Sequence, residues 1–203
     1  MLSIKDIELY LPKYLSPETE DKLFKDLSSF PDNIDDRIYI SNELDPDVIY
    51  QGDGLNDLLV INLPEQDIHK LPCMVLSNTC DINLGNKRQF RSNIIYSPIV
   101  KLDKYASLLI SNGIYDAQSI ESHLITLKNQ RITQIFYLPI GMNLDYEGLI
   151  FFDRLVSCDN ESIDRTNINE QRLFTLSQYG HYLFLFKLSV HFTRIMEGIE
   201  RPY

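Results

Sequence analysis

The residues best suited to chemistry lie together in one turn that directly follows an apolar run. They are Ser77, Thr79, Cys80 and Asp81, which supply two hydroxyls, a thiol and a carboxylate. Thr79 or Cys80 could act as a nucleophile, with Asp81 orienting a distant histidine such as His69. A thiol would also need a base or a positive potential nearby to become a thiolate. The competing interpretation is structural, because polar side chains after a strand commonly bond to turn backbone and a single Cys is commonly buried.

Basic residues gather a few positions further along the chain. The segment 83–90 has the composition of a flexible hairpin tip, and it carries Lys87, Arg88 and Phe90, with Arg91 directly after it. The cations could contact phosphate groups while Phe90 stacks on a base, which makes RNA a possible ligand. Basic residues at a loop tip can equally serve only to keep the loop solvated.

A β-rich core is needed to position the residues of the turn and the basic residues that follow it. Residues that favour strands, bounded by turn residues, predict five strands, at 58–63, 73–77, 92–97, 134–138 and 149–156. A helical insertion is expected at 103–130, because apolar residues recur there at helical spacing, with a break at Asn112-Gly113.

Helical segments are also expected at both ends of the chain. Residues 1–47 are expected to form an N-terminal extension that is helical and acidic. Ser16-Pro17, followed by acidic residues, predicts the start of a helix within it. A short strand is predicted at 37–41, near the end of this extension. Apolar residues on nearly all sides predict a long C-terminal helix at 170–198, either as a core helix or as part of an interface. Gly180 marks a close approach or a kink within it.

Composition limits the class of protein. With 203 residues, 44% of them hydrophobic, the chain can form one substantial core, and we expect a single domain over 1–203 with its β-rich core at 48–157. Three cysteines without zinc-ligand spacing favour a reducing, cytoplasmic location with no metal or cofactor. We expect no signal peptide and no membrane-spanning segment. A net charge of −10 disfavours non-specific binding to nucleic acid, so no DNA partner is expected.

Three short segments together resemble the PemK/MazF family of toxin ribonucleases. They are Gly52-Asp53, then Leu71-Pro72-Cys73-Met74-Val75-Leu76-Ser77-Asn78, then Ile94-Ile95-Tyr96-Ser97-Pro98-Ile99. The resemblance covers about a quarter of the chain. It implies an α+β protein built on a small, strongly curved β-barrel, often dimeric, which here would carry the added N-terminal helix, helical insertion and C-terminal helix. Active members of the family cut single-stranded RNA.

The chain departs from the family pattern at two positions that matter for catalysis. Leu71 stands where the family has an Arg before Pro72, and Lys70, one position earlier, is no equivalent for a planar two-pronged donor. The position of the catalytic Thr or Ser falls near Pro98, with Ser97 adjacent. These departures favour a binding or accessory subunit whose partner is another protein or a second copy. The resemblance implies a toxin–antitoxin or phage-defence setting.

Two enzymatic alternatives stay open at this point. One is a metal-independent RNA endonuclease with a rearranged site made of Lys70, Ser77 or Thr79, Asp81 and Arg91. In this mechanism the ribose hydroxyl attacks the adjacent phosphate while a basic side chain stabilises the developing charge. The other alternative is a cysteine-dependent hydrolase centred on Cys80.

Overall fold

The computed structural model describes residues 25, 36–40 and 44–193. The helix predicted to start at Ser16-Pro17 and the end of the predicted C-terminal helix lie outside these residues. Seven strands are present, namely β1 Asp53–Ile61, β2 Ile68–Val75, β3 Asn93–Lys101, β4 Ile135–Leu138, β5 Gly148–Phe151, β6 Val156–Asp159 and β7 Arg172–Thr175. The helices are α3 Thr79–Ile82, α4 Leu102–Asn112, α5 Ala117–Lys128, α6 Ile168–Gln171 and α7 Gln178–Thr193, with the 3-10 turns η1 Asp36–Ile38 and η2 Asn160–Ser162.

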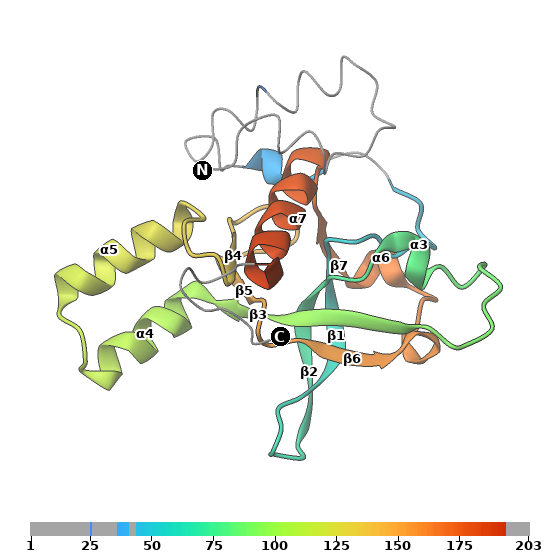
Figure 1. Ribbon diagram of the computed structural model, residues 1–203, viewed down its shortest axis with the longest axis horizontal. Helices are drawn as coiled ribbons and strands as arrows, with labels where there is room; N and C mark the ends of the chain where they lie inside the picture. The colour runs from blue at the N-terminus through green and yellow to red at the C-terminus, as the bar shows by residue number, and fades with distance from the viewer. Residues whose placement is uncertain (1–24, 26–35, 41–43, 194–203) are drawn as a thin grey trace, which may run out of the picture.

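All seven strands join one antiparallel sheet (Figure 1). The strand order is β4-β5-β3-β2-β1-β7, and β6 pairs with β3 beyond the end of β5. The predicted small, strongly curved barrel is therefore wrong, because this sheet is neither closed nor strongly curled. Short strands that match the family's local motifs do not fix how far a sheet curls; the pairing and the covering helices do.

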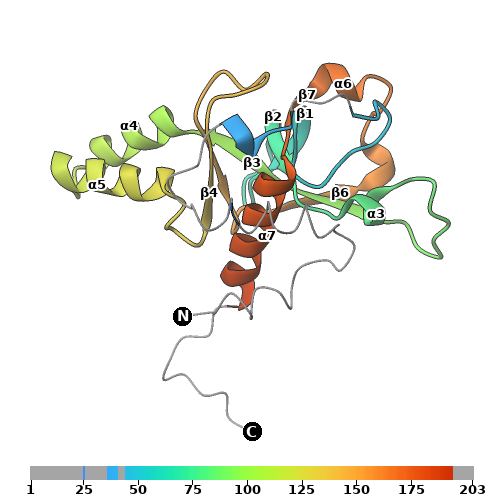
Figure 2. The ribbon, with the colours of Figure 1, turned by 90° about the horizontal axis from the view of Figure 1, so that it is seen from above.

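Helices protect both faces of the open sheet. On one face, α7 packs over a core formed with residues of several strands, including Met74 of β2, Phe136 of β4 and Ile150 of β5. The opposite face carries two smaller cores, one under α3 and α6 and one under α4 and α5. Figure 2 shows α7 and α6 on opposite sides of the sheet. Because both faces are covered in this way, apolar residues are buried without closure of the sheet.

The β3 strand changes partner along its length. Its first half pairs with β6, with Tyr96 opposite Val156, and its second half pairs with β5, with Ile99 opposite Ile150. The hydroxyl of buried Ser97 donates to the carbonyl of Phe151 at 3.0 Å where the partner changes. The single strand predicted at 149–156 is consequently two strands.

The C-terminal helix begins later than predicted. Residues 172–175 form β7, which pairs with β1 through Asp53 opposite Thr175 and Gly54 opposite Phe174. A Cβ on Gly54 would lie 2.3 Å from the Phe174 ring, so glycine allows the ring to lie against the strand. This pairing is non-local, and apolar periodicity in the sequence does not reveal it.

Candidate functional site

The turn that follows β2 uses its hydroxyl groups to hold the backbone. The Ser77 hydroxyl accepts from the amide of Ile95 at 2.8 Å, and the Thr79 hydroxyl accepts from the amide of Gln51 at 2.9 Å. Asn78 caps α3 by accepting from the Cys80 amide at 2.9 Å. Both hydroxyls therefore connect the turn to neighbouring segments.

Cys80 and Asp81 lie at the exposed start of α3. Asp81 accepts from Arg88 at 2.9 Å, and the Cys80 carbonyl accepts from Arg88 and from Asn86. The partner of Asp81 in the structure is thus a cation of the following loop. His69, which the sequence offered as a partner for Asp81, lies on β2 opposite Val60.

Lys70 lies apart from the turn on the same strand. It is exposed on β2 opposite Leu59, and five residues of extended strand separate it from Val75, about 16 Å at the usual rise per residue. The structure therefore brings Ser77, Thr79, Cys80 and Asp81 together but leaves Lys70 on the projecting part of the β1–β2 hairpin.

A half-buried histidine that sequence reasoning missed lies next to this turn. The Gln51 side-chain amide donates to the carbonyl of Leu76 at 2.7 Å, so its oxygen faces His181 Nε2 on α7 at 3.0 Å. The Nε2 atom must then carry the proton. Burial lowers the pKa of His181 and keeps the ring neutral. This chain of bonds connects α7 to the turn; His181 is far from Gln51 in sequence, and no local pattern joins the two.

The Gly-Asp pair quoted for the family resemblance has a structural role here. The Asp53 carboxylate, fully buried, meets Arg172 at 3.3 Å and accepts from the amide of Tyr50 at 2.8 Å and from the hydroxyl of Thr175. Burial raises the pKa of Asp53, and these donors oppose the rise. Since Arg172 is also nearly buried, the pair joins β1 to β7 inside the molecule.

The loop 83–91 is fixed at both of its ends by one buried side chain. The Asn160 amide group donates to the carbonyl of Ile82 and to the hydroxyl of Ser92, each at 2.9 Å. Arg165 donates to the same Ile82 carbonyl at 3.2 Å and to the Asn160 oxygen at 2.6 Å. Asn160 is 1% exposed, so the loop begins and ends on a buried anchor.

The same loop presents the residues predicted to bind RNA. Phe90 is 84% exposed, and Lys87 is exposed three positions before it. Arg91 pairs with Asp159 at 3.2 Å, and hydrogen bonds from the Glu161 amide and from Arg91 lower the pKa of Asp159. Ion pairs at the solvent-exposed surface contribute little to stability, so a ligand can displace this one.

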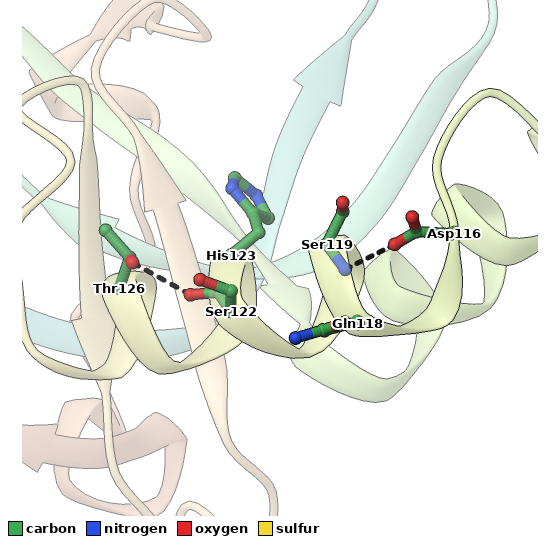
Figure 3. A pocket seen from close by; sticks show the side chains of 6 residues that line it. All are labelled: Asp116, Gln118, Ser119, Ser122, His123 and Thr126. Atoms are coloured by element: carbon green, nitrogen blue, oxygen red, sulfur yellow. Dashed lines mark hydrogen bonds between the residues drawn. The ribbon is translucent and has the colours of Figure 1, made fainter.

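A shallow hollow runs along α5, away from these residues (Figure 3). Its lining residues are Asp116, Gln118, Ser119, Ser122, His123 and Thr126. Asp116 caps the helix by accepting from the amide of Ser119 at 2.7 Å, and His123 Nε2 lies 3.0 Å from the Tyr105 hydroxyl. The hollow is therefore one face of α5, on which Asp116 caps the helix and His123 connects it to α4.

The described part of the chain contains no group of three or more His, Cys, Asp or Glu residues placed to hold a metal ion. In the same residues, no helix has both the length and the apolar character needed to cross a membrane. Comparison of the chain with protein-family models and with curated proteins finds no match in either case.

Proposed function

We propose that this protein is a binding subunit without catalytic activity, which recognises a protein partner through the loop 83–91. The observation that carries this proposal is the buried Asn160 anchor, which holds the loop while Phe90 remains 84% exposed. An exposed aromatic side chain on a fixed loop is a good anchor for an interface, because little conformational entropy is lost on binding.

The chemistry of the loop defines the kind of partner. Phe90 requires an apolar recess, and Lys87, together with Arg88 and Arg91, favours carboxylates at its rim. The partner surface is therefore an apolar pocket bordered by acidic residues. A toxin–antitoxin or phage-defence setting rests on the short-motif resemblance alone, and recognition by the loop does not require it.

Nuclease chemistry has weaker support. In the rearranged site expected from sequence, Lys70 would have to approach the same phosphate as Asp81 and Arg91, yet it lies on the projecting hairpin. Asp81 and Arg91 are each paired with another exposed residue, and the hydroxyls of Ser77 and Thr79 hold backbone amides. Electrostatic stabilisation of a transition state needs groups that converge on one point.

The first test is incubation of mixed single-stranded RNA without metal, with the wild type and with the Lys70→Ala/Arg91→Ala double variant. We expect RNA to stay intact with both proteins. Cleavage by the wild type that the double variant loses would overturn the non-catalytic proposal and support the endonuclease.

The second test uses a photoreactive phenylalanine analogue in place of Phe90 in the producing cells. The control is the same analogue in place of Tyr115, an aromatic residue that is 60% exposed on the α4–α5 connection. We expect a discrete protein adduct at position 90 that Lys87→Glu removes. Adducts of equal yield at both positions, or an adduct with RNA alone, would refute protein recognition by the loop.

A further inference from the structure

The β1–β2 hairpin extends beyond the rest of the sheet as a two-stranded arm (Figure 1). Its neighbours pair with it only at the base, β7 along Asp53 to Leu55 and β3 along Cys73 to Val75. The two strands of the arm pair onward from Leu58 opposite Leu71 to Ile61 opposite Ile68. A two-stranded ribbon is marginally stable by itself in water, so an apolar surface on it calls for cover.

Along β1, the two faces of the arm differ sharply in burial, whereas the β2 residues of the arm are exposed on both faces. Leu58 and Val60 point to the core under α3 and α6 and are 3% and 7% exposed. Leu59 and Ile61 alternate with them on β1 and are 47% and 40% exposed, and Ile68, opposite Ile61 on β2, is 63% exposed. We call Leu59, Ile61, Ile68 and Lys70 the outer face, since the register places these four side chains on one side of the ribbon.

Charge is distributed unevenly along the arm. Lys70 lies on the outer face near the base, opposite Leu59. The connection at the tip, 62–67, carries the carboxylates Glu65 and Asp67, together with the exposed Leu63. Asp57 is also exposed on β1 near the base, so Ile61 and Ile68 lie between an end that carries Lys70 and Asp57 and an acidic tip.

We propose that the arm is a self-association surface, on which a second copy of this chain packs its own outer face in the antiparallel direction about a two-fold axis. In that arrangement Ile61 and Ile68 of the two copies meet at the centre. Lys70 of each copy then faces Glu65 and Asp67 of the other, so one surface is complementary to itself, as a two-fold interface requires.

A second copy explains the arm better than an unrelated partner does. Each chain carries a net charge of −10, so two copies repel each other over most of their surfaces. In the antiparallel orientation each Lys70 lies near the carboxylates at the tip of the other arm, whereas the parallel orientation would bring the two acidic tips together. The area is small, and we expect a weak, concentration-dependent dimer.

Sedimentation velocity over a concentration series tests the proposal directly. We expect the mass to rise from that of one chain, 23.7 kDa, towards twice that value. Ile61→Asp should raise the dissociation constant at least tenfold, whereas Ile114→Asp, a control at a 73% exposed isoleucine far from the arm, should not change it. A mass of one chain at every concentration up to the millimolar range would overturn the proposal, as would loss of the dimer in the control alone.

Charge exchange then tests the orientation. The single variant Lys70→Glu and the double variant Glu65→Lys/Asp67→Lys should each weaken the dimer at low ionic strength. The triple variant that combines these three changes should return the dissociation constant to that of the wild type. All of these positions are exposed, and circular dichroism checks that each variant is folded. A triple variant as weak as its components would refute the antiparallel arrangement. Phe90→Ala should leave the dimer intact. Failure of partner recognition by the loop 83–91 can therefore be distinguished from failure of self-association through the arm.

Discussion

Gly180 shows how closely α7 approaches the rest of the molecule. A Cβ at this position would lie 2.2 Å from the carbonyl oxygen of Ile38, which is backbone and cannot move aside cheaply. The sequence marked this glycine as a close approach or a kink, and the close approach is confirmed. It allows α7 to pack against η1 and the strands below it.

Gly180→Ala should therefore destabilise the protein although alanine favours helix. We expect a loss of about 1–3 kcal/mol in the free energy of unfolding, because overpacking outweighs the gain in helix propensity. Urea unfolding measures the loss, with Ser189→Ala on the exposed side of α7 as the control. An unchanged or increased stability of Gly180→Ala would contradict the close packing.

His181 makes the stability of the fold depend on pH. Burial lowers the pKa of its imidazole in the folded state, while the unfolded chain titrates near its usual value of about 6.5. Below that value the unfolded chain binds more protons at this residue, so the contribution of His181 to the free energy of unfolding falls as the pH falls.

We expect His181→Gln to flatten this pH dependence in the range from pH 7 to pH 5. Unfolding in urea at a series of pH values measures the slope for the wild type and the variant. His69→Gln on the exposed arm serves as the control and should keep the wild-type slope. Equal slopes for the wild type and His181→Gln would argue against a lowered pKa of His181 in the folded state.

At the scale of elements, the Gln130 side chain forms hydrogen bonds with the backbone of the edge strand β4. The Gln130 amide donates to the carbonyl of Tyr137 at 2.6 Å and accepts from its amide at 3.1 Å, as a neighbouring strand would. Lys187 from α7 donates to the Gln130 oxygen at 2.8 Å and to the carbonyl of Ile135 at 2.5 Å. Unpaired edge groups invite association with other chains, and these two residues satisfy them.

Gln130→Ala should destabilise the protein by about 2 kcal/mol, because it leaves buried backbone groups of β4 without partners. The comparable change Gln118→Ala, at an exposed position of α5, should stay within about 0.5 kcal/mol of the wild type. Thermal and urea unfolding measure both. If the two variants lost equally little stability, water would be replacing Gln130 at the edge.

The loop 83–91 depends on the buried side chain of Asn160, which forms hydrogen bonds at both ends of the loop. Asn160→Ala removes the bonds to Ile82 and Ser92, so the loop should open more often. Trypsin cuts after Lys87, Arg88 and Arg91, and we expect it to nick Asn160→Ala at least several-fold faster than the wild type. Asn112→Ala, at an exposed helix end, is the control. Equal rates of nicking would contradict the anchoring role.

At the scale of the whole molecule, net charge governs what the surface attracts. The charge of −10 opposes RNA, and the acidic partners of Arg88 and Arg91 reduce the field of the basic loop. We expect labelled single-stranded RNA to bind weakly in fluorescence anisotropy, with a shallow dependence on salt, because few phosphates are neutralised. Tight binding with a steep salt dependence, reduced by Lys87→Ala, would favour RNA as the ligand.

Local patterns in the sequence determined which segments of the described chain become strands and helices over much of its length. The strands around 58–63, 73–77, 92–97 and 134–138 and the helical insertion at 103–130 were all predicted, with shifted boundaries. Strand propensity, apolar periodicity and turn residues act over a few positions, so a single sequence reveals them. The turn with Ser77, Thr79, Cys80 and Asp81 was located for the same reason.

Only the tertiary structure decided how these segments combine. The open sheet in place of a barrel, the pairing of β7 with β1 and the change of partner along β3 all depend on contacts between distant residues. The bonds from His181 to Gln51 and from Asn160 to both ends of the loop likewise join positions far apart in the chain. The physical reason is that strand pairing and burial depend on the whole folded chain. In the folded chain the hydroxyls of Ser77 and Thr79 accept backbone hydrogen bonds, whereas Phe90 and the outer face of the arm stay exposed.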